Sequence, residues 1–402
     1  MNWTRRVELV RFCAEHIPFY QRKFESIGFE IEDLKSEKDF QNLPILEKQE
    51  IREFSHEIVN PEFDLKSLPQ ATTGGTTGVP LKTYNDPRVH LSSMSWRMLE
   101  WWGLSPADNS AYLYRNVPAG IRKWKTDFAL LPTRRDYLSA ADMTSDNMER
   151  FYRKLLSLRP KYLVGYVGAI DEFARYLDRS NRKLTGLIGV WTTSAPLPAT
   201  KRSYYEGIFS CPVYTQYGSC EFYWIAAECN EQCGLHICSD IRHVDIVEGT
   251  EPVESGQFGD IVVTDLLNYA FPLLRYRIGD RGRLLDEKCG CGLPFPMMDY
   301  VKGRVSDSIR LMDGTAIPGE YWTTIFDDFT DSIRAFQVFQ GADYALEVRY
   351  EAYAGVDATR AIGIVEGRIG EKLRGRIPLS FKECDISAND NGKLRFVVSE
   401  LS

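Results

Sequence analysis

The chain has 402 residues, of which 44% are hydrophobic and 26% are charged, a balance typical of a soluble globular protein. Its length is enough for two or three domains with substantial hydrophobic cores. The formal net charge of -7, without any block of basic residues, argues against nucleic acid as the main partner.

The first segment is amphipathic, because apolar residues recur at helical spacing from Val7 to Ile17 instead of forming an unbroken apolar run. Neither a secretory signal peptide nor a membrane span is therefore predicted. The chain contains nine cysteines, so they cannot all form disulfides with one another, and no secretory signal is predicted. Both observations favour a reducing compartment, with thiols free or bound to metal. We expect a cytoplasmic protein that does not bind membranes, and we leave its oligomeric state open, a homodimer included.

The next distinctive stretch is Thr72–Pro80, which reads TTGGTTGVP and contains three glycines and four threonines. Glycine lets the backbone approach a ligand closely, and backbone N–H groups and hydroxyls donate to anionic oxygens. The stretch is not a Walker loop, because no Gly-Lys-Ser/Thr follows. It indicates a loop that holds a phosphate chain, with an ordinary surface turn as the alternative.

Helix and strand signals alternate from about residue 140. The spacing of apolar residues predicts helices over 148–156 and 170–177 and strands over 162–164 and 187–191. Such alternation indicates a parallel sheet covered by helices, with ligands beyond the carboxyl ends of the strands. Two segments occupy that kind of position, namely Ser194–Pro196 and Tyr217–Glu221.

A second pattern begins near residue 303. Residues 335–340 and 344–350 alternate apolar and polar side chains, a helix is predicted over 358–373, and short strands are predicted near 379 and 394. The expected fold is therefore α/β, with a large N-terminal domain of helix-covered sheets and a small α+β C-terminal domain. The predicted boundaries are residues 1–302 and 303–402.

Five short motifs stand in an order that resembles the adenylate-forming ligases. Gly75–Pro80 resembles that family's phosphate loop. Tyr217–Glu221 resembles its Y-G-x-T/C-E motif, and Tyr276–Asp280 its Y-R-x-G-D motif. Gly303–Asp307 resembles its G-R-x-D-D hinge, and Gly392–Arg395 resembles the segment of its catalytic lysine. Near the N-terminus, Ile17–Tyr20 and Leu43–Lys48 are similar to the phenylacetate–CoA ligase-like branch, which includes relatives encoded with capsule and polysaccharide genes. The resemblance covers residues 70 to 395.

The resemblance implies a reaction in two halves. A small carboxylic acid attacks the α-phosphate of ATP, with Mg²⁺, to give an acyl-adenylate and pyrophosphate. A thiol or amine then displaces AMP, and the commonest acceptor in the branch is CoA, with an amine or a carrier protein as alternatives. A nucleotide-binding scaffold without activity is a further alternative, whereas a zinc hydrolase fits poorly because His236 and His243 lack any known hydrolase spacing.

The resemblance also implies a role for each motif. Glu221 would bind Mg²⁺, which prefers oxygen ligands, and Asp280 would accept both ribose hydroxyls. Lys393 would bridge the acid and the α-phosphate as a compact charge, and Arg304 would touch ribose or phosphate. The small domain would swing about the hinge residues Ser306 and Asp307.

The nucleotide itself would be held by backbone groups, hydroxyls and one stacking ring. The phosphates would lie on Thr72, Thr73, Gly74, Gly75, Thr76, Thr77 and Gly78. Adenine would lie against Tyr217, near Gln216, Gly218 and Ser219, with Ser194, Ala195 and Pro196 as the other wall.

Taken singly, these residues have simpler explanations. Lys393 could be a surface lysine, Asp280 could close a turn, Glu221 could cap a helix and Tyr217 could be a buried aromatic. The order of the motifs favours the functional interpretation. Three positions depart from the family pattern: Val79 replaces a lysine, Ser306 an aspartate and Cys220 the commoner threonine.

A cysteine-rich segment predicts a structural zinc site. Zinc takes four Cys or His ligands, in pairs that are close in sequence, and several members of the branch carry zinc here. The preferred ligands are Cys229, His236, Cys289 and Cys291, with Cys233 or Cys238 as a substitute for His236. Four protein ligands leave no open position, so the ion would clamp loops; the alternative is a group of free thiols.

Aromatic residues make up 12% of the chain, which suits a flat acid as substrate. Candidates for the acid pocket are Tyr112, Tyr114, Trp124, Phe128, Tyr166 and Trp191, although such residues more often form core. The identity of the acid is not predicted.

Overall fold

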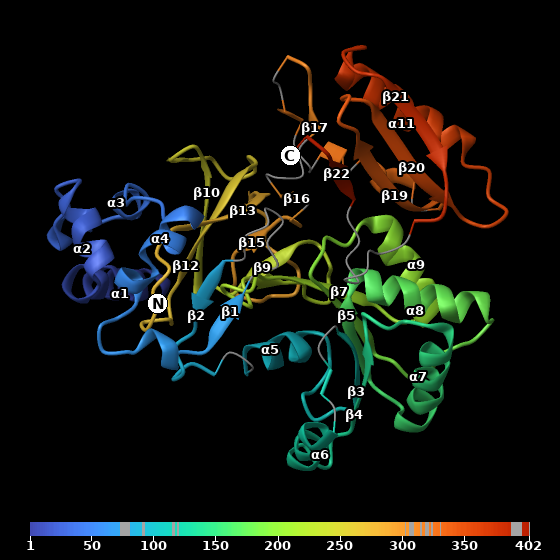
Figure 1. The fold of residues 1–402 in the computed structure, drawn as a ribbon, viewed down its shortest axis with the longest axis horizontal. Helices are drawn as coiled ribbons and strands as arrows, with labels where there is room; N and C mark the ends of the chain where they lie inside the picture. The colour runs from blue at the N-terminus through green and yellow to red at the C-terminus, as the bar shows by residue number, and fades with distance from the viewer. Residues whose placement is uncertain are drawn as a thin grey trace. The chain divides into compact units, whose positions relative to one another are not determined.

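The computed structural model describes residues 1–72, 81–90, 93–114, 117–118, 120–301, 303–304, 309–313, 316–317, 321–322, 325–329, 331–386 and 396–401. The chain divides into two compact units (Figure 1). The first unit consists of Met1–Met98 and Tyr217–Val301, and the second of Leu99–Gln216 and Lys302–Ser402.

Four α-helices open the first unit: α1 Asn2–His16, α2 Pro18–Glu25, α3 Glu37–Gln41 and α4 Lys48–Ile58. Pro18 begins α2, where a missing N–H costs nothing. Ser36 caps α3, because its side chain accepts from the Asp39 N–H while the Asp39 carboxylate accepts from the Ser36 N–H. The amphipathic N-terminal helix predicted from the sequence is confirmed as α1.

The strands of the first unit are antiparallel. One sheet has the order β11-β10-β12-β13, and a smaller set pairs as β14-β15-β9-β8. The bounds are β8 Ala226–Ala227, β9 Leu235–Ile237, β10 Arg242–Glu248, β11 Glu251–Pro252, β12 Gly259–Asp265, β13 Tyr276–Gly282, β14 Leu284–Leu285 and β15 Met297–Met298, while β1 Gln70–Thr72 pairs with β2 Lys82–Tyr84.

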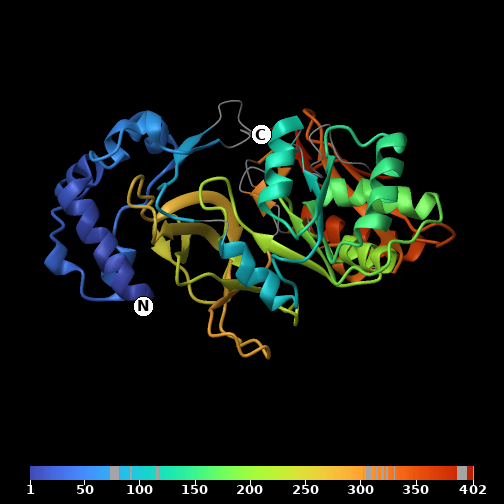
Figure 2. The same ribbon diagram turned by 90° about the horizontal axis from the view of Figure 1, so that it is seen from below.

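A single hydrophobic cluster joins the helices of the first unit to its sheet. Leu9 and Phe40, from α1 and α3, share this cluster with Ile261 and Val263 of β12. Figure 2 shows the N-terminal helices, in blue, beside the strands of this sheet, in yellow. Burial of the apolar helix faces therefore fixes the helices on the sheet.

The second unit contains the parallel sheet predicted from the sequence. Its strands run in the order β7-β6-β5-β3-β4, and every pair within that run is parallel. The strands are β3 Ser110–Tyr114, β4 Arg135–Ser139, β5 Tyr162–Tyr166, β6 Gly189–Thr193 and β7 Val213–Tyr217, and the helices are α6 Gly120–Ala129, α7 Ser145–Leu158, α8 Val167–Arg179 and α9 Ala199–Phe209. Helix α5 Met94–Trp101 contains the division between the two units at Met98. The predicted helices over 148–156 and 170–177 and strands over 162–164 and 187–191 are thus confirmed as α7, α8, β5 and β6.

The C-terminal part of the second unit has a mixed sheet with the order β21-β20-β19-β22. The predicted alternating strands are β19 Ile333–Gln340 and β20 Leu346–Ala352, and the predicted helix is α11 Thr359–Leu373. The strand expected near 379 is β21 Leu379–Glu383, whereas Leu394 lies outside the described residues and β22 is Val397–Ser399. One short antiparallel pair, β17 Ile309–Arg310 with β18 Ala316–Ile317, belongs to this part, and β16 is Gly303–Arg304. The proposed boundary at residues 302 and 303 stays a prediction.

Within the ranges given above, no helix combines the length and the apolar character that crossing a membrane requires.

Gly165 sits in the middle of the parallel sheet, on β5. A Cβ added there would lie 2.8 Å from the Cβ of Leu113 on β3, closer than side-chain carbons approach one another. Glycine is therefore required at this position so that the two strands can pair at their observed spacing.

We expect Gly165→Ala to lower the free energy of unfolding by about 1–3 kcal/mol, because overpacking forces the strands apart. Gly207→Ala, in the exposed face of α9 with nothing within 4 Å of its added Cβ, is the matched control and should raise stability by about 0.5–1 kcal/mol. Urea denaturation followed by circular dichroism measures both. Equal stability of the two variants would contradict the packing argument.

Candidate functional site

The carboxyl ends of the parallel strands carry the first group of predicted site residues. Ser194, Ala195 and Pro196 follow β6 directly, and Gln216 lies in β7, the neighbouring strand. The Gln216 Nε2 group donates to the Thr193 hydroxyl at 2.7 Å, which ties the two strand ends together. Ser194 has a φ of 72°, a left-handed conformation that is unusual for a residue other than glycine and that turns the chain at the sheet edge. The predicted placement of this segment after a strand is confirmed.

In the first unit, two motifs that lie far apart in sequence meet through a hydrogen bond. The Tyr217 hydroxyl donates to Asp280 Oδ2 at 2.9 Å, and both side chains are buried. A buried carboxylate is costly unless hydrogen-bonded, so Tyr217 both orients Asp280 and compensates part of its desolvation. Tyr217 is therefore a buried aromatic with a polar function, and its role against adenine stays a prediction.

A second tyrosine–carboxylate pair lies in the same unit. The Tyr276 hydroxyl donates to Glu221 Oε1 at 3.3 Å, and the Ser219 hydroxyl accepts from the Glu221 N–H at 3.2 Å. Burial, together with the negative charge of Glu221, raises the pKa of Tyr276 well above its ordinary value, so Tyr276 remains a donor. Glu221 is only 6% exposed and lies in a turn instead of capping a helix. A carboxylate oxygen is the kind of ligand that a hard cation such as Mg²⁺ prefers.

Arg277, in the middle of the same motif, belongs to the framework. Its Nε donates to Glu47 at 2.9 Å, and its Nη1 pairs with Asp260. The backbone of the motif is also joined to the N-terminal region, because the Leu46 N–H donates to the Arg275 carbonyl at 2.9 Å and the Arg277 N–H to the Leu46 carbonyl at 3.0 Å. These contacts hold the strand that presents Asp280.

Several predicted residues cannot be placed. Thr72 ends β1, and its hydroxyl accepts from the Gln70 amide at 2.9 Å, but the rest of the loop lies outside the described residues. The residues concerned are Thr73, Gly74, Gly75, Thr76, Thr77, Gly78, Ser306, Asp307 and Lys393, and for Arg304 only the backbone, in β16, is described. Their roles stay predictions.

The four preferred zinc ligands lie together. The Sγ atoms of Cys229, Cys289 and Cys291 and a ring nitrogen of His236 are all within 4.8 Å of one another. The Cys229 and Cys289 sulfurs are 3.5 Å apart, and the Cys291 sulfur is 3.3 Å from His236 Nε2. His236 Nδ1 lies 3.3 Å from the Phe295 carbonyl, a contact that directs Nε2 toward the thiols. This Cys₃His set matches the ligands that tetrahedral zinc takes in structural sites.

The two substitute ligands have different surroundings. Cys233 Sγ is 3.3 Å from Cys289 Sγ and so lies at the rim of the group. Cys238 is buried and interacts with the Arg97 guanidinium, which is itself paired with Asp240 at 2.6 Å. The geometry therefore favours His236 over either cysteine as the fourth ligand.

Crowding of the thiols separates their pKa values. Burial would raise the pKa of Cys289, but the Cys291 N–H and the neighbouring thiols of Cys233, Cys291 and Cys229 donate to it and lower it to about 6. Burial raises the pKa of Cys229 to about 12 and that of Cys233 to about 11. One thiolate is therefore present at neutral pH before a metal ion binds.

A second possible cluster, Glu37, His243 and Asp245, also has its ligand atoms within 4.8 Å of one another. The Arg6 guanidinium already occupies it, since both of its terminal nitrogens lie 2.6 Å from Glu37 oxygens and Nη1 lies 3.2 Å from His243 Nε2. The cluster is thus a network of ion pairs that joins α1, α3 and β10.

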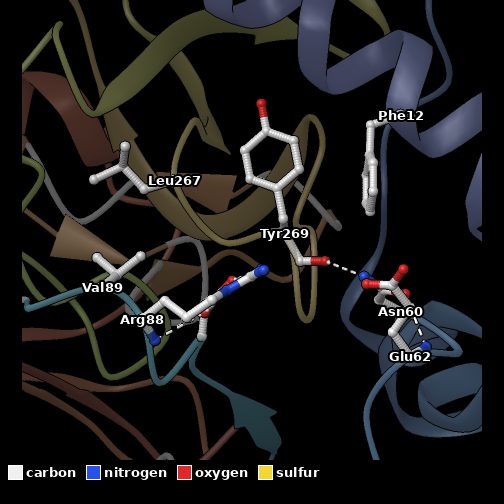
Figure 3. A pocket seen from close by; sticks show the side chains of 8 residues that line it. Phe12, Asn60, Glu62, Arg88, Val89, Leu267 and Tyr269 are labelled. Carbon is white, nitrogen blue, oxygen red and sulfur yellow. Dashed lines mark hydrogen bonds and ion pairs between the residues drawn. The ribbon is translucent and has the colours of Figure 1, made fainter.

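A cavity of about 330 Å³ lies elsewhere in the first unit (Figure 3). Its wall contains the aromatic rings of Phe12 and Tyr269, and the Asn60 side-chain amide donates to the Tyr269 carbonyl at 3.3 Å. The Arg88 side chain pairs with the buried Asp86 carboxylate at 2.6 Å, which neutralises its charge. None of the predicted site residues that the structure describes lines this cavity, so it is separate from the described motifs.

Of the six aromatic residues considered for the acid pocket, two end parallel strands. Tyr114 ends β3 and Tyr166 ends β5, with ring centroids 5.2 Å apart. Tyr112 stacks on Tyr137, and Trp191 packs edge-on against Trp102. Trp124 and Phe128 stack on each other on α6 and are both 66% exposed. Tyr114 and Tyr166 are therefore the members of this set that occupy the ligand-binding edge of such a sheet.

The sequence interpretation missed a buried ionic cluster in the second unit. Asp171, Arg175 and Lys201 are almost completely buried, and the Asp171 carboxylate forms an ion pair with each of the two cations. Asp171 and Arg175 lie beside the apolar face of the helix predicted over 170–177, where charged side chains are normally solvated, so no local signal marked them as buried.

The sequence is similar to those of curated phenylacetate–coenzyme A ligases. It is 26% identical over 344 residues to that of Escherichia coli (strain K12), covering 80% of this chain and 73% of the relative. Identity to the Thermus thermophilus enzyme is also 26%, over 333 residues, covering 78% and 72%. Protein CapK of Staphylococcus aureus is 25% identical over 259 residues, covering 61% and 54%. The chain belongs to the adenylate-forming ligase superfamily.

The fold of this superfamily extends over nearly the whole chain. The structure of 2-hydroxyisobutyryl-CoA ligase in its postadenylation state has a TM-score of 0.75 at 18% identity, covering 99% of this chain and 89% of that one. The amide bond synthetase McbA from Marinactinospora thermotolerans has a TM-score of 0.52 at 14% identity, covering 79% and 66%. No family model matches the chain. The predicted α/β ligase fold and family are confirmed.

In chelator-treated protein, we expect Cys289 to be alkylated by iodoacetamide with a midpoint near pH 6, because its pKa is lowered to about 6 and the thiolate is the reactive form. Reactivity should therefore be high at pH 7 and fall as the pH drops below 6. Peptide mass spectrometry resolves Cys289 from Cys233, the exposed control, whose pKa of about 11 leaves it as an unreactive thiol at pH 7. Faster labelling of Cys233 would show that the thiol network is assigned wrongly.

Proposed function

We propose that this adenylate-forming ligase activates a carboxylic acid with ATP and transfers the acyl group to CoA. The observation that carries the proposal is the pairing of each motif carboxylate with a motif tyrosine, Asp280 with Tyr217 and Glu221 with Tyr276. The carboxylate oxygen of the acid would attack the α-phosphorus of ATP, and the bond to pyrophosphate would break. The CoA thiol would then attack the acyl carbon, lose its proton and release AMP.

The first half-reaction requires charge stabilisation more than covalent catalysis, since two anions must be brought together. In the proposal, Asp280 accepts the ribose hydroxyls and Glu221 supplies an oxygen ligand to Mg²⁺, which would neutralise phosphate charge when bound. The buried, tyrosine-held carboxylate of Glu221 suits a hard cation, which supports this assignment. Lys393 and Arg304 would act on the acid and the α-phosphate from a small mobile domain, residues 303–402, that swings about Ser306 and Asp307.

CoA is proposed as the acceptor because the curated relatives include phenylacetate–coenzyme A ligases, and because 2-hydroxyisobutyryl-CoA ligase has the same fold in complex with 2-HIB-AMP and CoA. An amine acceptor is the second candidate, favoured by the likeness to an amide bond synthetase, and a carrier-protein thiol is the third. The tyrosine pair at the ends of β3 and β5 supports a flat or aryl acid.

The test is pyrophosphate release from ATP and Mg²⁺ with a panel of aryl, aliphatic and amino acids, phenylacetate first, each with and without CoA. Lys393→Ala should lower acid-dependent release by at least about 100-fold while leaving the fold intact, because the lysine acts on charge in the transition state. Lys382→Ala, which removes an exposed lysine of β21, is the control and should retain full activity.

Product masses separate the candidates: a thioester supports CoA transfer, and an amide or acylated carrier the alternatives. Unchanged pyrophosphate release by the Lys393 variant would remove this lysine from the mechanism. If no acid of the panel causes pyrophosphate release while the protein still binds ATP, the nucleotide-binding scaffold would be favoured instead.

We also propose that Cys229, His236, Cys289 and Cys291 hold one structural zinc ion. Three sulfurs and one imidazole nitrogen within 4.8 Å fit the ion, and one thiol already favours the deprotonated form that zinc binds. With four protein ligands, the ion would tie the loop after β8 to the loop between β14 and β15.

Purified protein should therefore contain about one zinc per chain by elemental mass spectrometry, in keeping with a single four-ligand site. Cys291→Ser should lose most of the metal and melt at lower temperature, because the ion would no longer be held by four ligands. Cys384→Ser is the matched control, since this half-buried cysteine lies outside the cluster and should leave zinc content unchanged. Full zinc content in Cys291→Ser would refute the ligand set.

A further inference from the structure

Helix α8 carries a buried pair of opposite charges that a lysine of α9 joins. The Asp171 carboxylate lies 2.8 Å from Arg175 Nε and 2.6 Å from Lys201 Nζ. Asp171 and Lys201 are fully buried, and Arg175 is 1% exposed. One carboxylate therefore faces two cations, and the cluster is not neutral by itself.

The excess positive charge is met by the C-terminal part of the same unit. Arg175 Nη2 donates to Glu351 Oε2 at 2.6 Å, and Nη1 donates to Glu351 Oε1 at 3.1 Å. Arg175 also pairs with the Asp385 carboxylate and donates to the Ile386 carbonyl. A single guanidinium thus binds β20 and the chain that follows β21.

The energetics make this contact hard to replace. A buried guanidinium needs nearly all of its N–H groups paired, because removing one partner of a buried pair leaves an uncompensated charge. The planar fork of arginine can serve a helix carboxylate, a strand carboxylate and a backbone carbonyl at once, which a lysine cannot. Burial would raise the pKa of Asp385, but the Arg175 charge outweighs burial and lowers it.

The anchored residues stand immediately before the segment that carries Lys393. Asp385 and Ile386 are the last described residues before 387–395, so only six residues, 387–392, separate Ile386 from Lys393. The seven Cα–Cα steps between these two residues span at most about 25 Å. The Arg175 side chain, on a helix that covers the parallel sheet, therefore holds the residues that precede the segment carrying Lys393.

We infer that Arg175 is a positioning residue for adenylation: it holds Asp385 and Ile386, the root of the segment that presents Lys393. The inference rests on the proposed function, in which Lys393 bridges the acid and the α-phosphate. Asp385 is 63% exposed at its side chain and Glu351 12%, so Asp385 is the partner that water can most easily replace.

Arg175→Met removes the contact with Asp385 and Ile386 without leaving a buried carboxylate unpaired. Methionine keeps the apolar stem, Asp171 keeps Lys201, and Glu351 keeps its ion pair with Arg334. Arg179→Met is the matched control: it lies one turn further along α8, is 65% exposed, and reaches Asp385 only at 3.5 Å.

The first measurement is hydrogen–deuterium exchange, which does not depend on the protein's activity. In Arg175→Met, peptides ending at Ile386 should exchange at least about tenfold faster, while α8 itself stays protected and Arg179→Met resembles wild type. Unchanged exchange in Arg175→Met would overturn the anchor.

The second measurement is pyrophosphate release with ATP and the acid that the panel identifies. For Arg175→Met, kcat should fall about 10- to 100-fold with the KM for ATP within about twofold, since the lysine is misplaced but the nucleotide site is not. Arg175→Lys should recover part of kcat, and Asp385→Asn should lose less than Arg175→Met. A rise in KM with unchanged kcat would overturn the positioning role.

The two readouts separate the inference from the proposed function. Faster exchange with normal kcat would leave Arg175 as a structural contact only and overturn the inference. If wild-type protein adenylates nothing on the panel, the proposed function fails, and with it the role of Arg175 in catalysis, whatever the exchange data show.

Discussion

The carboxylate of Asp171 is the constraint around which the second unit is arranged. It is fully buried in α8, and it can stay ionised only because Lys201 and Arg175 reach it from either side. Burial would raise the pKa of Asp171, but these two cations outweigh burial and lower it. The second cation then needs carboxylates of its own, which the C-terminal part supplies through Glu351 and Asp385. One buried charge thus links a helix of the parallel sheet to strands more than 170 residues later.

In the first unit, Asp280 and Glu221 each accept a hydrogen bond from a tyrosine hydroxyl. A tyrosine orients a carboxylate without adding a formal charge of its own. In the proposed function these two carboxylates bind ribose and Mg²⁺, whereas Asp171 and its partners join two parts of the second unit.

Local periodicity predicted much of the fold, because α7, α8, β5, β6 and α11 each bury one continuous apolar face whose spacing is visible in the sequence. The convergence of Cys229, His236, Cys289 and Cys291 was also predictable, since cysteines and histidines at short spacing favour a common metal site. The contacts of Arg175 were not predictable, because a charged residue on a helix is normally solvated and its partners lie 176 and 210 residues away. The tyrosine partners of Asp280 and Glu221 depend likewise on the pairing of distant segments, which no local pattern encodes.

The burial of Arg175 has a consequence for how the enzyme responds to its medium. Dissolved ions screen charges that water can reach, with a Debye length of about 8 Å at physiological salt, but they do not penetrate a site that is 1% exposed. The contact of Arg175 with Glu351, whose side chain is 12% exposed, is therefore less sensitive to ionic strength than a surface ion pair, whereas the contact with Asp385, which is 63% exposed, stays open to screening. Heating acts differently, because the cost of dehydrating charges falls as temperature rises. The buried part of this contact is therefore expected to change with temperature more than with salt.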